Sequence, residues 1–292
     1  MLFRSGSEWA KKTVAKLGAM ENVTLMSDTT IFGAYDHGIY GAIENRASEA
    51  REDNDKPRQV NWRIYTKRAI LCAGATERLI AFGNNDRPGI MLASAVRTYL
   101  NRFAVATGQR ISVYTNNDDG WKTAKDLNAK GFRVAAVIDS RSISPVMRVP
   151  GAEICMGTDV VDTKGRRALK SIQLSNGKSI DTDTLAVSGG WNPNLHFTCH
   201  HRGVPKWNEE ITSFVPDSSP PVGMSVAGRA KGTMVLADAI IEGHNQGSSI
   251  AAELGYKASE SKPATTPVVS YNVSANWGIP SGKNRAWVDF QN

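Results

Sequence analysis

The chain has 292 residues, of which 41% are hydrophobic and 22% are charged, a composition typical of globular proteins and sufficient for one large or two medium domains. Its net charge of +7 comes from 35 basic and 28 acidic residues that are scattered along the sequence, which favours a solvated surface over a nucleic-acid-binding face. No apolar run approaches the roughly 20 residues of a membrane helix, and the N-terminus has no apolar segment of signal-peptide length.

Cysteine and histidine are sparse. Cys72, Cys155 and Cys199 lie far apart and form no C-x-x-C motif. This spacing disfavours a disulfide framework, a zinc site and a dithiol redox centre, and it fits a reducing cytoplasm. The histidines are too scattered to predict a metal site: His37, His196, His200, His201 and His244.

The first part of the chain alternates between helix and strand patterns. Residues 7–20 are predicted to form a short helix, and β-branched and aromatic residues predict strands within 22–45 and 60–75. The polar run 47–58 between them is predicted to be a loop. A further helix is expected over 91–103, where apolar residues recur at three- and four-residue intervals.

Residues 109–141 have the order strand, loop, helix, glycine stop and strand, which predicts one βαβ unit of a parallel sheet. More strands are expected within 152–165, 168–181 and 184–190. A last long helix is predicted from Thr233 to Leu254. The segment "KASESKPATTP" that follows has linker composition, and the closing "RAWVDFQN" is expected to be a strand.

Three glycine turns are candidates for ligand contact. The strand "AILC" ends at Ala73-Gly74-Ala75, and small side chains at a parallel strand's carboxyl end leave room for a ligand. A tight corner with a positive φ at glycine explains the same residues, so both interpretations stay open. The second turn holds Gly189 and Gly190.

In the third turn a strand ends at Gly228, and unpaired N–H groups of a helix beginning near Thr233 could receive a phosphate. On that helix Gly243 and Gly247 would let another element pack closely, and we interpret both as packing residues.

These elements together resemble the flavoproteins with two dinucleotide-binding domains. The stretches "GATERLIAFGNNDRPGIMLASAVRTYLNR", "LAVSGGWNPNLH", "VAGRAKGT" and "RAWVDFQN" are similar to the α subunits of heterotetrameric sarcosine oxidases over roughly residues 10–292. The resemblance implies an α/β fold of two interleaved Rossmann-like domains. The first would comprise 1–106 and 211–256 and lack its opening βαβ unit with the G-x-G-x-x-G turn. The second would be an inserted NAD-type domain at 107–210.

The same resemblance implies that 257–292 is a linker and the start of an aminomethyltransferase-like folate domain, and that only "MLFRS" is foreign to the family. It implies NAD bound in this segment, FAD and FMN at the partner subunit and the interface, and tetrahydrofolate in the folate domain. The predicted cofactor-binding residues are Ala73, Gly74, Ala75, Gly189, Gly190, Gly228, Arg229, Gly232 and Thr233.

The implied activity is oxidative demethylation of sarcosine, a secondary amine, to glycine, with peroxide formed and a one-carbon unit passed on. The partners would be β, γ and δ subunits, without nucleic acid, membrane or metal, in the cytoplasm. No catalytic residue is assigned to this chain, and we expect 1–292 alone to be inactive. Arg229 departs from flavoproteins of the wider group, which usually carry an aspartate there, and this disfavours flavin at that turn.

The inserted βαβ unit carries "TNNDDG" where a nucleotide-binding loop would show glycines. Asp118 and Asp119 would repel a phosphate there. Asp139 lies where a ribose-binding carboxylate is expected, but we interpret it as a surface aspartate of a structural unit. Asn116 and Asn117 could contact an adenine or a neighbouring domain.

Two further hypotheses come from other classes of protein. One is a self-contained flavin-dependent pyridine-nucleotide oxidoreductase, against which the missing C-x-x-C and Arg229 argue. The other is a structural docking module whose nucleotide pocket is vestigial.

Overall fold

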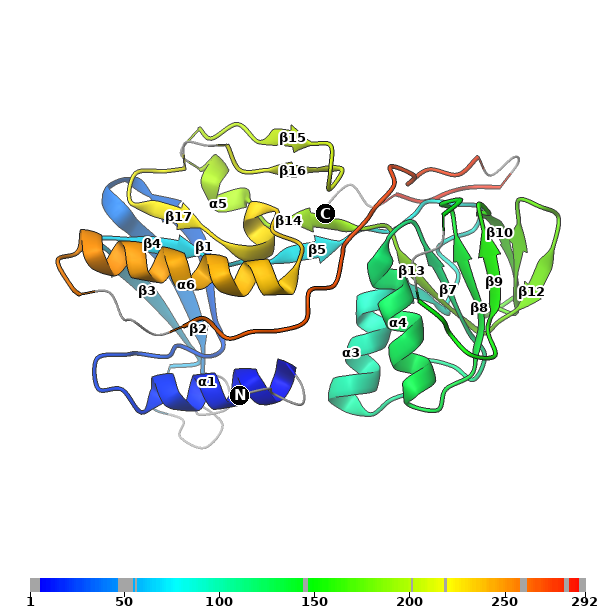
Figure 1. Cartoon of the computed structure of the whole chain (residues 1–292), viewed down its shortest axis with the longest axis horizontal. Coiled ribbons are helices and arrows are strands. Elements are labelled where there is room, and N and C mark those ends of the chain that lie inside the picture. The colour runs from blue at the N-terminus through cyan, green and yellow to red at the C-terminus, as the bar shows by residue number, and fades with distance from the viewer. Residues whose placement is uncertain are drawn as a thin grey trace. The chain divides into compact units, whose positions relative to one another are not determined.

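The computed structural model describes residues 6–46, 55, 57–143, 147–200, 202–217, 220–257, 262–280 and 284–288, and it divides into two compact units (Figure 1). Unit 1 comprises Met1–Gly74, Pro193–Lys206 and Phe214–Val269, and unit 2 comprises Ala75–Asn192, Trp207–Ser213 and Ser270–Asn292. Because the chain passes repeatedly between the units, they are interleaved. The predicted α/β fold with Rossmann-like units is confirmed.

The units differ from the predicted domains in where they divide. We predict that the first domain runs to residue 106, whereas the structure places Ala75 and the residues after it in unit 2. The reason lies in the segment 90–103, whose strand belongs to the sheet of unit 2 and whose helix packs on that sheet. The end segment that we predict to be a linker and the start of another domain is divided at Val269, with Ser270–Asn292 in unit 2. The domain assignment as such stays a prediction.

Unit 2 is built on a five-stranded parallel sheet in the order β6-β13-β7-β8-β9. Its strands are β6 (Ile90–Leu92), β7 (Ile111–Thr115), β8 (Val134–Asp139), β9 (Glu153–Met156) and β13 (Thr184–Ser188). Every residue of β7 and β13 is buried, as expected of central strands covered on both faces. The predicted βαβ unit is therefore present.

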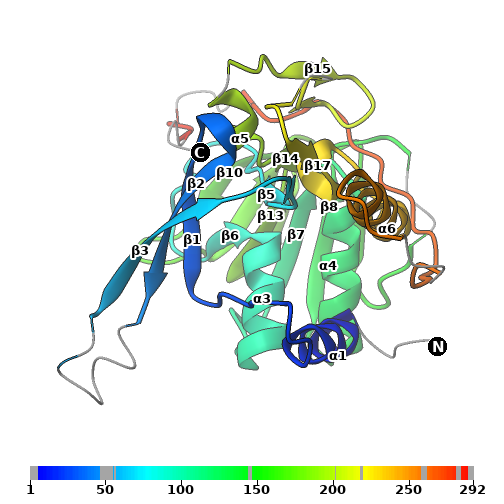
Figure 2. The ribbon, with the colours of Figure 1, turned by 90° about the vertical axis from the view of Figure 1, so that its left-hand side faces the viewer.

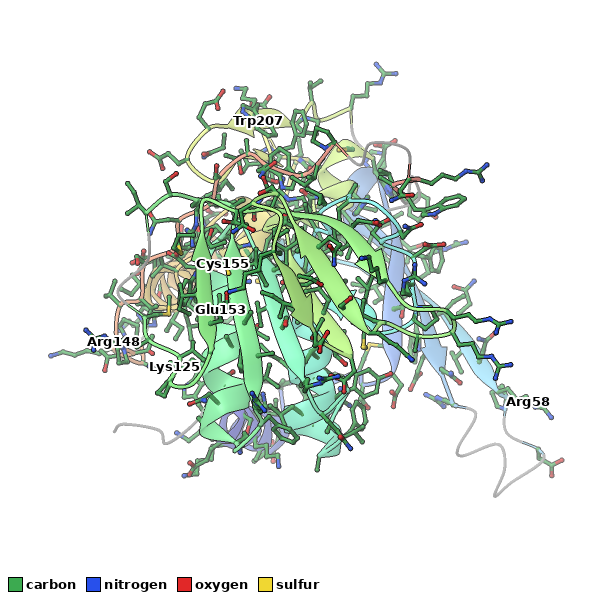
Figure 3. The ribbon with its side chains drawn as sticks, turned by 90° about the vertical axis from the view of Figure 1, so that its right-hand side faces the viewer. Arg58, Lys125, Arg148, Glu153, Cys155 and Trp207 are labelled. Atoms are coloured by element: carbon green, nitrogen blue, oxygen red, sulfur yellow. The ribbon has the colours of Figure 1, made fainter. Side chains whose placement is uncertain are left out.

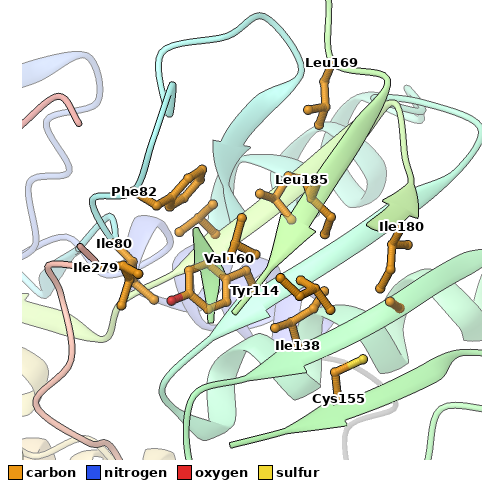
Figure 4. Close-up of a cluster of buried hydrophobic side chains, with 14 residues drawn as sticks. Ile80, Phe82, Tyr114, Ile138, Cys155, Val160, Leu169, Ile180, Leu185 and Ile279 are labelled. Atoms are coloured by element: carbon orange, nitrogen blue, oxygen red, sulfur yellow. The ribbon is translucent and has the colours of Figure 1, made fainter. Parts of the chain in front are cut away.

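Two buried clusters cover the two faces of this sheet. On one face, α3 (Ala93–Phe103) and α4 (Asp118–Ala129) cover the sheet (Figure 2). The buried cluster on that face includes Val96, Trp121 and Val113 of β7. On the other face, Tyr114 and Leu185 meet the side chains of an antiparallel sheet (Figure 4). That sheet consists of β10 (Val160–Lys164), β11 (Ser171–Leu174) and β12 (Ser179–Asp181).

Shorter elements complete the connections. β5 (Ala75–Glu77) pairs with β14 (Trp191–Pro193), and β15 (Lys206–Asn208) pairs with β16 (Ser213–Val215). A four-residue helix, α5 (His196–Cys199), lies between β14 and β15 in the chain.

Unit 1 contains an antiparallel sheet and a parallel strand pair. The first has the order β1-β2-β3, with β1 (Thr29–Tyr35), β2 (Ile39–Asn45) and β3 (Gln59–Tyr65). The second consists of β4 (Ala69–Leu71) and β17 (Met224–Val226). Besides α5, the helices of this unit are α1 (Gly6–Gly18), the 3₁₀ turns η1 (Asp36–Gly38) and η2 (Gly228–Lys231), and α6 (Leu236–Glu253).

Several predicted boundaries need correction. The last helix begins at Leu236 rather than near Thr233, because η2 and a left-handed Gly232 (φ +99°) come first. The end segment contains no strand at 285–288, and 289–292 lie outside the described residues. The predicted loop 47–58 lies mostly outside them as well, as does "MLFRS".

Candidate functional site

In unit 1 two of the predicted turns lie side by side. β4 and β17 run parallel, with Leu71 paired to Val226, so the residues after both strands emerge at the same edge. Gly74 and Gly228 both have left-handed backbones, at φ +72° and +67°. A Cβ built on Gly74 would meet no atom within 4 Å, and one on Gly228 would meet only the Ala239 Cβ at 4.0 Å. The structure thus brings the 73–74 and 228–233 turns together and leaves open space beside both glycines.

The first turn is held by a residue that the sequence reading did not single out. Asn194 donates from its backbone N to the Gly74 carbonyl at 3.0 Å and from Nδ2 to the Ala73 carbonyl at 3.0 Å. These two bonds fix the carbonyls of the turn and leave the Gly74 Cα side uncovered. Nothing in the sequence around Asn194 indicates this contact, because Asn194 lies 120 residues beyond Gly74 in the chain.

The second turn is held by Glu242 of α6. Its carboxylate accepts hydrogen bonds from the Gly228 backbone N (2.7 Å), the Thr233 hydroxyl (2.9 Å) and the Lys231 Nζ (2.6 Å). Burial raises the pKa of Glu242, but the three hydrogen bonds outweigh it and lower that pKa below the ordinary value. A carboxylate of the chain therefore already occupies an anion position at this turn.

The N–H groups expected to receive a phosphate are accordingly paired within the chain. Besides the Gly228 N–H, the Thr233 N–H donates to the Gly228 carbonyl at 3.1 Å, and the Gly232 N–H donates to the Arg229 carbonyl at 3.0 Å. Sequence reasoning missed Glu242 because it lies fourteen residues beyond Gly228, and only the fold of α6 brings it back to the turn.

A groove with a volume of about 530 Å³ follows one side of α6 from this turn. It is lined by Lys231, Thr233, Asp238, Ile241, Glu242, Asn245, Gln246 and Ser249. All of these except Ile241 can donate or accept hydrogen bonds. The groove suits a polar ligand that extends along the helix.

We expect Glu242→Gln to lower the free energy of unfolding by about 1–2 kcal/mol at neutral pH, because a hydrogen bond to an ionised group is stronger than one to a neutral amide. A carboxyl whose folded pKa is depressed stabilises above its unfolded pKa and loses that stabilisation as pH falls through the folded value. The difference between the two proteins should thus be full at pH 7.5 and shrink below the ordinary value of 4.5. Urea unfolding at both ends of this range measures it.

The matched control is Glu253→Gln on the same helix, whose pair with Arg68 is exposed and contributes little. An effect of Glu242→Gln no larger than that of this control would show that the carboxylate does not hold the turn.

In unit 2 the glycine pair after β13 is packed against the chain itself. Gly189 donates to the Arg78 carbonyl at 2.7 Å, and the Arg78 N donates to the Gly190 carbonyl at 2.8 Å. A Cβ on Gly189 would lie 2.7 Å from the Leu79 carbonyl oxygen, and one on Gly190 would lie 2.8 Å from the Arg78 Nη2. These two glycines, unlike Gly74, are surrounded by protein. Ala75, also predicted to contact a cofactor, begins β5 in the same unit.

A buried polar network lies beside this pair. Ser188, the last residue of β13, donates to the Glu77 carboxylate at 2.6 Å, and the Ser94 N donates to the same carboxylate at 2.7 Å. Asn117 Nδ2 donates to the Ser188 carbonyl at 2.9 Å. Burial raises the pKa of Glu77 despite these bonds, and Asp119 adds to the increase. The carbonyl and hydroxyl groups of Ser188, at the end of β13, therefore have hydrogen-bond partners within the protein.

Asp139, which we interpreted as a surface residue, is fully buried, and that interpretation was wrong. It accepts hydrogen bonds from Trp121 Nε1 (2.7 Å) and Arg141 Nη2 (2.7 Å). Arg141 also donates to Asp118, itself buried, at 2.8 Å. Burial lowers the pKa of Arg141, but the two carboxylates outweigh it and raise that pKa. These bonds assign Asp139 a structural role within unit 2.

The three cysteines are free thiols, and each lies in the described part of the chain. Cys155 is buried next to Glu153, to which its thiol donates (Figure 3), and burial above all raises its pKa to about 11. Cys72 and Cys199 are exposed, and burial of part of the side chain raises the pKa of Cys72, with a contribution from Glu242. Among the described residues, no group of three or more potential ligands could hold a metal, and no helix has the length and apolarity to cross a membrane.

Comparison with solved structures identifies the class of fold. L-proline dehydrogenase from P. horikoshii matches 89% of this chain and 49% of its own, with a TM-score of 0.66 and 20% identity. T. acidophilum thioredoxin reductase matches 78% of this chain and 73% of its own, with a TM-score of 0.53 and 16% identity. The chain therefore has the fold of the FAD/NAD(P)-binding oxidoreductases.

Comparison by sequence is more specific. The chain is 36% identical over 302 aligned residues to sarcosine oxidase subunit alpha of Rhizobium meliloti (strain 1021), with 99% of this chain matched. The chain spans about 30% of the length of that curated relative. No protein-family model matches it. Over nearly its whole length the chain is therefore similar to one part of the sarcosine oxidase α subunits, which confirms the resemblance predicted from its motifs.

Proposed function

We propose that this chain supplies dinucleotide binding and scaffold to an oxidoreductase subunit of the sarcosine oxidase type, and that the dinucleotide is NAD, bound in unit 1. The observation that supports this proposal is the contrast between the two units. The turns at Gly74 and Gly228 have open space beside them, whereas the space beside Gly189 and Gly190 is filled by Arg78 and Leu79.

The residues of unit 1 fit the chemistry of such a ligand. Left-handed glycines at two parallel strand ends let a flat or extended group approach the backbone, and a Cβ at Gly74 would fill that space. Arg229 and Lys231 bring positive charge to the second turn, which suits a pyrophosphate. Bound NAD would supply a nicotinamide that can exchange a hydride. Glu242 would have to share the Gly228 N–H with the ligand or give it up.

The remaining parts of the proposal rest on the sequence relationship. In a whole protein of this type, FAD and FMN would lie with a partner subunit and at the subunit interface, and tetrahydrofolate would bind in a folate domain. The assembly with β, γ and δ subunits would oxidise sarcosine or a similar secondary amine in the cytoplasm. This chain would orient a dinucleotide and contact partners, with no catalytic residue of its own.

The structure also favours a second candidate, a docking module whose nucleotide pocket is vestigial. Glu242 already bonds the Gly228 N–H, so the turn is complete without a phosphate. Extraction of cofactor from the intact, assembled subunit separates the candidates. NAD supports the first, no nucleotide supports the second, and FAD would favour a self-contained flavin-dependent reductase.

We expect Gly74→Val to reduce the NAD retained per folded intact subunit at least tenfold, because a branched side chain would fill the open space beside the turn. The measurement is acid extraction followed by quantitation of NAD against protein.

A valine at a positive φ also strains the backbone, so the control must carry the same strain. Gly255→Val provides it, because Gly255 in unit 1 has φ +84° and open space around its Cα but lies beyond α6. Equal NAD content in the two variants would mean that the 73–75 turn is only a corner.

A further inference from the structure

The crevice that a Rossmann-like sheet offers to ligands lies in unit 2 between β13 and β7. The chain proceeds from β7 to β8 and β9 on one side, while β13 and β6 lie on the other. Ligands of such sheets bind at the carboxyl ends of the strands where the order reverses. Here Ser188 ends β13 and Gly189 follows it, and Asn116 and Asn117 follow β7.

A segment of the same unit, residues 271–279, occupies this crevice, and we call it the strap. Asn116 Nδ2 donates to the carbonyls of Ser274 (2.8 Å) and Asn276 (3.1 Å), and the Ser274 N donates to the Asn116 carbonyl at 2.9 Å. Asn117 forms an antiparallel β-bridge with Val273. The strand end after β7 is thus paired with an extended backbone.

The strap also contacts the start of α4, where a nucleotide-binding unit would hold a pyrophosphate. The Asp118 N donates to the Asn272 carbonyl at 3.1 Å, and the Asn117 side chain accepts from the Asp119 N at 2.9 Å. In return, the Asp118 carboxylate accepts from the Asn272 N (2.9 Å) and Nδ2 (2.8 Å). Oxygens of the protein thus accept hydrogen bonds from the N–H groups at the start of α4, where a phosphate would otherwise accept them. The Asp118 carboxylate accepts from N–H donors of Asn272, and a phosphate has no such donors.

The far end of the strap is anchored on β13 and in the core. Trp277 Nε1 donates to the Gly189 carbonyl at 2.6 Å, and the Arg78 guanidinium lies 4.2 Å from the Trp277 ring centroid. The Ala81 N donates to the Trp277 carbonyl at 2.7 Å, and the Ile279 N returns a bond to Ala81 at 2.8 Å. Ile279 is buried among the core side chains near Ile80 (Figure 4).

We propose that the crevice of unit 2 is a peptide-binding site that has replaced nucleotide binding, with the strap as its resident ligand. A peptide backbone offers alternating N–H donors and carbonyl acceptors. Asn116, Asn117 and Asp118 pair with both kinds of group along the strap. A phosphate provides acceptors only and would face the Asp118 and Asp119 carboxylates. The site is therefore selective for polypeptide, and this inference stands apart from the proposed function of unit 1.

A peptide supplied in trans tests the site. The probe is a fluorescein-labelled peptide of residues 270–280, "SYNVSANWGIP". We expect the variant Trp277→Ala/Ile279→Ala, whose strap has lost two anchors, to bind it at least tenfold more tightly than the wild-type chain, whose crevice is filled. Adding Asn116→Ala to that variant should weaken peptide binding at least tenfold. A folded double variant, verified by circular dichroism, that binds the peptide no better than wild type would overturn the proposal.

Hydrogen exchange on the unaltered chain gives a second readout that needs no variant. Addition of NAD or ADP at millimolar concentration should leave the exchange of residues 271–279 and 116–119 unchanged. Faster exchange in the strap together with slower exchange at 116–119 would show that a nucleotide displaces it. The crevice would then be a nucleotide site under a lid, and the proposal would be wrong.

Discussion

Replacing Arg141 with alanine is expected to destabilise unit 2 by about 3–5 kcal/mol, because it leaves buried carboxylates without their cation. Asp139 is fully buried and Asp118 is 1% exposed. Arg141 bonds both of them, at 2.7 and 2.8 Å, and a third bond of 3.0 Å reaches the Asn272 carbonyl of the strap. Trp121 still donates to Asp139 in the variant, but Asp118 would keep only donors from Asn272.

Chemical unfolding followed by far-UV circular dichroism measures this loss. The matched control is Arg97→Ala, which removes an exposed ion pair with Asp126 in the same unit and should cost less than about 1 kcal/mol. In the Arg141→Ala background, Asp139→Asn should recover part of the stability, since it removes one uncompensated buried charge. If Arg141→Ala proves as mild as Arg97→Ala, the three residues do not form the buried network that the structure indicates.

The parts of the fold that follow local patterns could be predicted from the sequence. The βαβ unit in 109–141 has strands with β-branched residues, a helical period and a glycine stop, and each signal lies within its own element. The turns at Gly74 and Gly228 were each predictable, because small residues follow apolar strands there. Their position side by side follows from the pairing of β4 with β17, which the sequence did not indicate.

The groups that complete the sites were not predictable, because they come from distant parts of the chain. Glu242 reaches the Gly228 turn from α6, and Asn194 reaches the Gly74 turn across 120 residues. The strap lies within 257–292, which we predicted to be a linker and the start of another domain, and nothing local in "SYNVSANWGIP" indicates that it pairs with Asn116. Burial of Asp139 likewise depends on Trp121 and Arg141, whose contact with it is a product of the fold.

Glycine gives the most ambiguous signal, since it leaves room equally for a ligand or for the chain itself. Gly74 and Gly189 follow strands of similar composition, yet only Gly74 has open space where a Cβ would lie. Replacing Gly189 with alanine therefore distinguishes two roles. A packing residue would lose stability, whereas a cofactor contact would lose bound NAD.

Gly189→Ala is expected to destabilise unit 2 by about 2–3 kcal/mol. The new Cβ would lie 2.7 Å from the Leu79 carbonyl oxygen and 2.9 Å from that of Arg78, and neither backbone atom can move without disturbing β5 and the residues that follow it. The shift would also strain the bond from Gly189 N to the Arg78 carbonyl and the bond from Trp277 to the Gly189 carbonyl.

Urea unfolding of the variant, compared with Gly278→Ala, measures this cost. Gly278 lies in the same unit, and a Cβ there would meet no atom within 4 Å, so its replacement should change stability by less than about 0.5 kcal/mol. Should Gly189→Ala instead keep full stability and lose NAD from the intact subunit, Gly189 would be a cofactor contact and the crevice of unit 2 would be open to nucleotide.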